Sequence, residues 1–273
     1  MDSNAPARAA QEVQSHRAFR WTARAGYAAN GVVHILIGVI ALVVAFGGRG
    51  ETDQSGALNA IAAAPLGFLL LWVLAITLCA LGLWHAAEGI RARKPSDDAM
   101  GDGRKWGKRI GEWGQAVIFI ALGILSAAVA LGANVDAEEA AEGASRGLLD
   151  VPGGSIVLGL VGVGVGITGV AFVVMGLRRS FRNTVDIPEH GMGRSVAALG
   201  VIGFVAKGIA LLILGVLLIV AAVTTDADVA GALDGALRAL LALDYGPLLV
   251  GAVSIGLIAY GVFSLFRAPY ARL

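Results

Sequence analysis

Residues 56–67 read GALNAIAAAPLG, and two later segments resemble them: GASRGLLDVPGG at 143–154 and GALRALLALDYG at 235–246. Each segment has twelve residues, and a glycine stands at both ends of all three. A long apolar stretch follows each one directly. Similar segments in equivalent positions indicate an internal repeat. The sequence therefore predicts three copies of one structural unit.

Six apolar stretches are long enough to cross a membrane. Hydrophobic residues make up 57% of the 273 positions and charged residues only 15%, which is far more apolar than a typical soluble protein. A helix needs about 20 apolar residues to cross the hydrocarbon core. The predicted spans are Gly26–Phe46, Leu66–Ile90, Gly111–Ala133, Gly154–Leu177, Val196–Val223 and Gly246–Phe266. The predicted fold is all-α, with three parallel helical hairpins.

Small residues recur every seven positions along these spans. In a gapless alignment of the three copies, 18 positions on the odd and even spans are all Gly, Ala or Ser. Such stripes let helix backbones approach closely within a membrane. Three parallel hairpins imply a pseudo-threefold axis along the membrane normal. The glycines expected to pack helices are Gly31, Gly38, Gly82, Gly123, Gly169, Gly208, Gly215 and Gly261.

The distribution of charge predicts the orientation in the membrane. Seventeen of the 21 Lys and Arg residues fall on one side, in the two termini and the two loops between copies. Because basic residues accumulate on the cytoplasmic side, both termini are expected in the cytoplasm of a bacterial cell, with the protein in the plasma membrane. The expected organisation is a tail (1–23), repeats at 24–95, 109–182 and 194–273, and linkers at 96–108 and 183–193.

The segments between the two spans of each copy contain short amphipathic stretches. In the third copy Leu233, Leu237 and Leu240 recur at helical spacing. This pattern is typical of helices that lie on the outer leaflet. A lid over a central cavity is the alternative interpretation.

A family resemblance rests on RAGYAANGVVHILIGVIAL at 24–42, with its Arg-x-Gly-Tyr start and spaced glycines. This stretch and its two copies resemble the bacterial integral membrane proteins grouped as domain of unknown function 1206. The resemblance covers the chain from about residue 20 onward and implies a two-helix domain that occurs three times, with no assigned activity. Copy two departs from the pattern at Glu112 and Trp113. Copy three has Val201 where the others have Arg24 and Arg109.

Lys207 interrupts the apolar stretch GFVAKGIALL at 203–212 and aligns with Asn30 and Gln115 in the other copies. A lysine at the bilayer centre costs about 2.5–3.5 kcal/mol. Its ammonium group could reach the headgroups by snorkelling, or it could pair with Glu88 or Glu112 in a polar cluster near the axis. The candidate cluster comprises Asn30, His34, His85, Glu88, Glu112, Gln115 and Lys207.

The leading functional hypothesis is binding of membrane lipids or protein partners, including a second copy of the chain, without catalysis. The alternative is a small-solute, ion or proton transporter that uses the slot formed by Asn30, Gln115 and Lys207. GVGITG (164–169) and GASRG (143–147) match catalytic or nucleotide-binding motifs only by letter, because no strand precedes them. A net charge of +1 gives no reason to expect a nucleic-acid partner.

His34 and His85 raise the further hypothesis of a haem-bearing redox protein, since two imidazoles on separate helices are able to ligate iron. Neither histidine recurs in the other copies. The single cysteine, Cys79, excludes an internal disulfide and a CxxC metal site. We therefore expect no cofactor and no metal.

Overall fold

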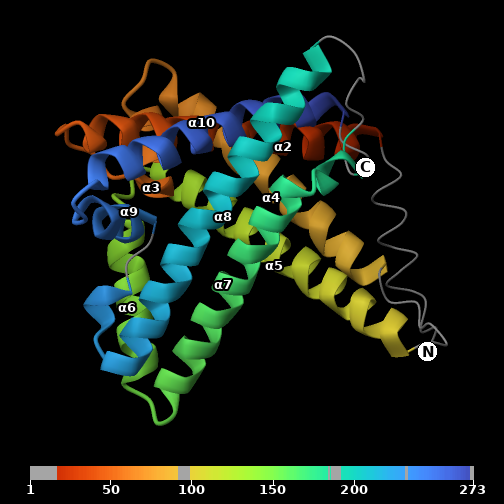
Figure 1. Ribbon diagram of the computed structural model, residues 1–273. Coiled ribbons are helices and arrows are strands. Elements are labelled where there is room, and N and C mark those ends of the chain that lie inside the picture. Colours follow the sequence, from red (N-terminus) through yellow and green to blue (C-terminus); the bar gives the residue numbers. More distant parts are fainter. Residues whose placement is uncertain (1–16, 92–98, 184, 186–191, 231–232, 271–273) are drawn as a thin grey trace.

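The computed structural model describes residues 17–91, 99–183, 185, 192–230 and 233–270, and these contain helices but no strand (Figure 1). Six of the helices contain a stretch long and apolar enough to cross a membrane. They are α2 (Arg17–Ala45), α4 (Gly67–Arg91), α5 (Ala99–Ala130), α7 (Gly154–Leu177), α8 (Met192–Thr224) and α10 (Gly246–Tyr270). The prediction of an all-α membrane protein with six spans is confirmed.

Shorter helices join the two long helices of each repeat at one end of the molecule. They are α3 (Gln54–Ala62), α6 (Ala137–Leu149) and α9 (Leu233–Leu241), together with the 3-10 helix η2 (Ala227–Val229). Figure 1 shows this end on the left and both chain termini on the right. A second 3-10 helix, η1 (Ser180–Asn183), follows α7.

The glycine at the end of each twelve-residue segment has the same structural role in all three copies. Gly67, Gly154 and Gly246 are the first residues of α4, α7 and α10. A Cβ atom on any of them would collide with a backbone carbonyl of the short helix before it, at Ile61, Leu148 and Leu241 respectively. Glycine therefore allows each even helix to start directly against the preceding short helix.

The closest helix pairs are formed between repeats. Helix α4 packs along α5, α7 along α8, and α10 along α2. Each even helix thus lies against an odd helix of another repeat, with α10 of the last repeat packed along α2 of the first. Within repeats, α2 contacts α4 and α8 contacts α10, whereas α5 and α7 make almost no contact with each other.

The stripes of small residues lie in these inter-repeat interfaces. A Cβ atom on Gly31 would lie 2.7 Å from the carbonyl oxygen of Gly261, and one on Gly169 would lie 2.7 Å from that of Gly208. At each of the eight glycines singled out in the sequence, an added Cβ would come within 2.7 Å of an atom of the neighbouring helix. The helix backbones are therefore too close for a larger side chain.

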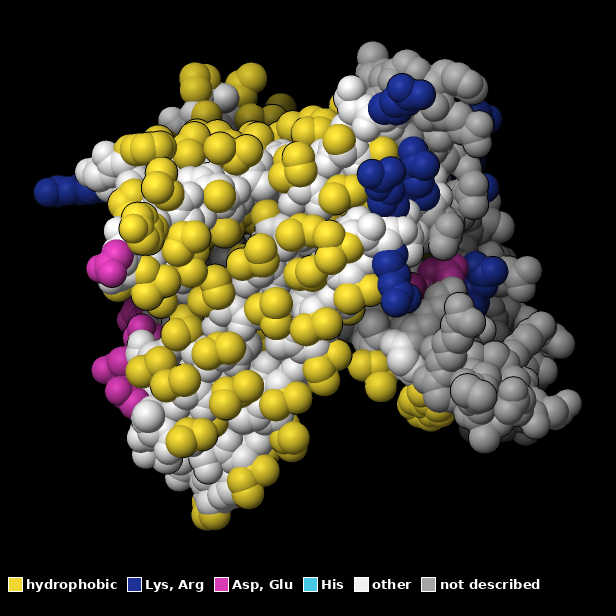
Figure 2. Space-filling view, in the orientation of Figure 1, with side chains coloured by type: hydrophobic (Ala, Val, Ile, Leu, Met, Phe, Trp, Pro, Cys, Tyr) yellow, Lys and Arg dark blue, Asp and Glu magenta, His cyan; other side chains and the backbone are white. Residues whose placement is uncertain are grey.

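The surface has the charge distribution expected of a membrane-spanning protein. Figure 2 shows a broad apolar band that separates most of the visible acidic side chains, on the left, from most of the visible Lys and Arg side chains, on the right. The basic end is the end that carries the chain termini. This is the side that the positive-inside rule assigns to the cytoplasm.

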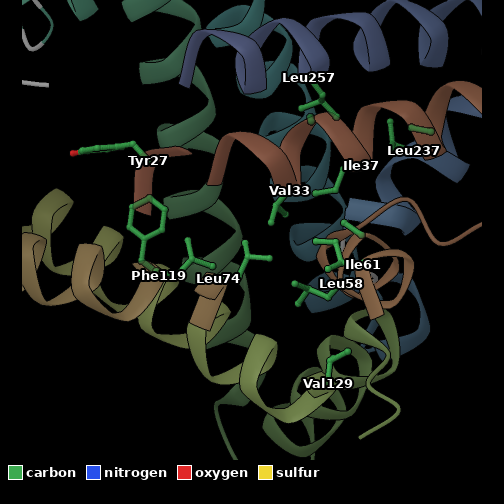
Figure 3. Close-up of a cluster of buried hydrophobic side chains, with 14 of the residues drawn as sticks. Tyr27, Val33, Ile37, Leu58, Ile61, Leu74, Phe119, Val129, Leu237 and Leu257 are labelled. Carbon is green, nitrogen blue, oxygen red and sulfur yellow. The ribbon is translucent and has the colours of Figure 1, made fainter. Parts of the chain in front are cut away.

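Two parts of the structure differ from the sequence-based expectation. Residues 99–108, expected in a linker, form the first turns of α5. Helix α3 turns its apolar side toward the protein interior, where Leu58 and Ile61 are buried in the central apolar cluster with Val33 and Ile37 of α2 (Figure 3). Residues 1–16 of the predicted tail and 96–98, 184 and 186–191 of the predicted linkers lie outside the described residues.

Replacing Gly169 with valine should weaken the fold, because the new side chain would strike Gly208 and Leu212 on α8. Overpacking of this kind costs about 1–3 kcal/mol, so we expect a lower midpoint of thermal unfolding in detergent. The matched control is Gly164→Val on the same helix, where an added Cβ meets nothing within 4 Å. Equal losses in the two variants would contradict the packing role of the stripe.

Candidate functional site

Lys207 lies near the midpoint of α8 and is surrounded by neutral groups. Its Nζ is 3.1 Å from His34 Nε2 and lies over the rings of Tyr260 and Phe172, at 4.3 and 5.3 Å from their centroids. The side chain is half-buried. No carboxylate oxygen of a described residue lies within 4.0 Å of this ammonium group.

The contacts of His34 indicate its protonation state. Its Nδ1 is 2.8 Å from the backbone oxygen of Asn30, which accepts hydrogen bonds but cannot donate them. The Nδ1 atom must therefore carry the hydrogen, and a neutral ring leaves Nε2 free to accept from Lys207. His34 is buried, and its ring also packs on Tyr260 at a centroid distance of 4.8 Å. The histidine acts as a neutral acceptor for the ammonium group.

A second set of polar contacts runs from Arg267 to Glu112. Arg267 donates to the hydroxyl of Tyr27 at 3.3 Å, and its guanidinium lies 4.2 Å from the centre of the Tyr27 ring. The Tyr27 hydroxyl is 3.4 Å from His85 Nε2, and His85 Nδ1 is 2.7 Å from Glu112 Oε2. With the proton of His85 on Nδ1, every group in this chain donates to the next.

The second network joins all three repeats. Arg267 belongs to α10 of repeat three, Tyr27 and His85 to α2 and α4 of repeat one, and Glu112 to α5 of repeat two. Its two ends carry opposite charges, so the positive charge of Arg267 has a negative counterpart within the network. Lys207 has no carboxylate counterpart among the described residues, and in this respect it differs from Arg267.

The structure brings together only part of the predicted cluster. Asn30 is buried and Lys207 half-buried, but Gln115 is exposed on α5. Glu88 bonds Arg91 on its own helix at 2.8 Å. Glu112 meets His85 and not Lys207 because α5 packs along α4, whereas α8 packs along α7 and α10. The repeated polar slot is therefore not equivalent in the three copies.

Sequence reasoning missed the aromatic and arginine partners of the site. Tyr27 stands inside the motif at 24–42, but nothing in the motif suggests that its ring faces a cation on the last helix. Arg267 belongs to the basic group at the C-terminal end, where a role in orientation is enough to explain it. Tyr260 and Phe172 are apolar enough to be taken for core residues.

The two histidines do not form a pair. Both ring nitrogens of His34 and both of His85 already have partners, and the two residues lie in separate networks. The described residues hold no group of three or more His, Cys, Asp or Glu side chains arranged for a metal ion. Each imidazole is thus engaged by the partners of its own network.

The family model described as Domain of Unknown Function (DUF1206) matches the chain three times, over residues 25–92, 110–179 and 202–271. The chain belongs to this family. Each match of the DUF1206 model contains one odd and one even long helix, so the resemblance seen at residues 24–42 is confirmed.

One relative of this DUF1206 protein is the "Uncharacterized protein YxxB" of Bacillus subtilis (strain 168). It is 29% identical over 257 residues, which cover 92% of this chain and 90% of the relative. The similarity thus extends over all three repeats. No solved structure matches the chain.

Replacing Glu112 with alanine should destabilise this DUF1206 protein, because His85 would lose the acceptor for its Nδ1 hydrogen. Leaving a buried donor unsatisfied costs about 1–3 kcal/mol, which thermal unfolding in detergent would report. The control is Gln115→Ala, an exposed position one turn further along α5, where a change of less than about 0.5 kcal/mol is expected. A neutral result for Glu112→Ala would show that the network adds nothing to the fold.

Proposed function

We propose that the protein is a lipid-binding protein of the bacterial plasma membrane, in which Lys207 receives the phosphate of an anionic lipid. The observation that carries the proposal is the environment of the Lys207 ammonium group. It contacts a neutral imidazole and two aromatic rings, and no described carboxylate lies within 4.0 Å of it.

The neighbours of Lys207 compensate its charge only in part. An ammonium group over an aromatic face gains about 0.5–2 kcal/mol, and one hydrogen bond from a charged donor adds about 1.5–3 kcal/mol. Removing a cation from water costs several kcal/mol. A phosphate oxygen beside Nζ would supply the missing negative charge and a further acceptor.

The position of Lys207 fits a lipid of the cytoplasmic leaflet. In the repeat alignment it lies six residues inside the level of Arg24, or about 9 Å along a helix, and a lysine side chain spans much of that depth by snorkelling. Arg267 lies two turns beyond Tyr260 on α10, toward the chain termini. Arg267 therefore lies closer to the expected headgroup level than Lys207 does.

The basic surplus at the same end favours this ligand class. Anionic lipids of the cytoplasmic leaflet attract basic residues by about 1 kcal/mol per charge near the surface. The transport hypothesis requires instead that Asn30, Gln115 and Lys207 share a polar path. Gln115 is exposed while Asn30 is buried, so the geometry favours binding at one site over passage through the axis.

Stabilisation by lipid tests the proposal. The midpoint of thermal unfolding is measured in detergent with added phosphatidylglycerol, phosphatidylcholine or inorganic phosphate. We expect phosphatidylglycerol to raise the midpoint of the natural protein more than phosphatidylcholine does, and Lys207→Gln to remove most of that difference. The matched control is Arg182→Gln, an exposed basic residue at the same end, which should retain it.

Three results would contradict lipid binding at Lys207. The first is an unchanged phosphatidylglycerol effect in Lys207→Gln, and the second is an equal loss in Arg182→Gln, which would indicate general surface attraction. The third is an equal effect of inorganic phosphate, which would identify a soluble anion. Counterflow of labelled phosphate in liposomes would then test transport directly.

A further inference from the structure

At the end opposite the chain termini, side chains from all three repeats meet around Asp234. This residue lies in the first turn of α9 of repeat three and is only 2% exposed. Thr52, in the loop before α3 of repeat one, donates to Asp234 Oδ1 from its backbone N at 2.8 Å and also from its hydroxyl. Repeats one and three are therefore joined through a single carboxylate oxygen.

Repeat two reaches the same place through α6. The backbone N of Ala137 donates to Ser55 Oγ of repeat one at 3.1 Å. The next residue, Glu138, lies beside Asp234 and is 3.6 Å from an Arg238 nitrogen through its Oε2. Arg238 also contacts Asp234 Oδ2 at 2.6 Å. One arginine thus faces two carboxyl groups.

The second oxygen of Asp234 lacks a donor. Oδ2 is buried, and its contact with Arg238 does not have hydrogen-bond geometry, so it accepts no hydrogen bond from the described residues. A hydrogen bond between two carboxyl groups needs one of them to be protonated. A proton on Glu138 would satisfy Asp234 Oδ2 and would remove one of two adjacent negative charges.

Most of the surroundings of Glu138 favour its protonated form. Burial, the adjacent Asp234 carboxyl and the charge of Glu142 together raise the pKa of Glu138 to about 7, against the opposing effect of Arg238. In the loop before α3, burial and the charges of Asp136 and Asp53 raise the pKa of Glu51. This surface favours uptake of a proton over a second ionised carboxylate.

We infer that Glu138 and Asp234 form a proton-binding site on the outer face, in which one shared proton holds the outer segments of the three repeats together. The ligand is a proton, and the site reports the pH outside the membrane. It is independent of the lipid site, which lies near the midpoint of α8.

The sign of the pH effect follows from linkage. Glu138 binds its proton more tightly in the folded chain than in the unfolded chain, where its pKa is about 4.3. The stability that this proton contributes is therefore complete at low pH and is lost as the pH rises through about 7. Above that pH the ionised Glu138 repels Asp234 and the junction loosens.

Two measurements test the site on the full-length protein in detergent. The first is the midpoint of thermal unfolding from pH 5 to 8.5, and the second is hydrogen exchange of the Thr52 amide, corrected for the intrinsic effect of pH. In the natural protein we expect the midpoint to fall and the amide to lose protection as the pH rises from 5 to about 7, and both to level off above that pH. In Glu138→Gln both transitions should disappear, because glutamine donates to Asp234 at every pH.

The matched control is Glu139→Gln, an exposed carboxyl on the same turn of α6, which should retain both transitions. Transitions of equal size in Glu138→Gln and the natural protein would overturn the inference, as would their loss in Glu139→Gln. If Glu138→Gln were too unstable to measure, isotope-edited infrared spectroscopy would decide. A protonated carboxyl band that disappears near pH 7 supports the site, and its absence at pH 5 overturns it.

Discussion

The close approach of helix backbones between repeats is the constraint on which the structure depends. Inside a bilayer, two apolar helices gain nothing from excluding water, and short side chains allow the backbone contact that holds them together. The glycines at positions 31, 169 and 208 make that contact across α2–α10 and α7–α8. Because each such interface joins two different repeats, these helix pairs hold the three repeats together.

Polar groups also connect the repeats, at the two ends of the molecule. On the side of the termini, Arg267, Tyr27, His85 and Glu112 connect helices from all three repeats. On the opposite side, Thr52, Glu138 and Asp234 do so with a different set of side chains. Neither set recurs from copy to copy. The three copies therefore share their small-residue interfaces and differ in the polar groups that connect them.

The spans, the repeats and the small-residue interfaces could be predicted from the sequence, because each depends on a local pattern of residues that recurs at equivalent positions in the three copies. The sequence was insufficient for the polar contacts. Equivalent slots in the alignment suggested that Asn30, Gln115 and Lys207 converge, but the near absence of contact between α5 and α7 leaves Gln115 exposed. The burial of α3 was also missed, since a short run of alanine and leucine suits a core and a membrane surface equally well.

The pairing of the first long helix with the last has a consequence for biosynthesis. Helix α2 is synthesised before the other five spans, yet its closest neighbour, α10, is the last of the six to be made. Until α10 has entered the bilayer, the stripe at Gly31 and Gly38 lacks the helix against which it packs in the finished fold. A chain that stopped after two repeats would leave α2 without the surface it is shaped to fit.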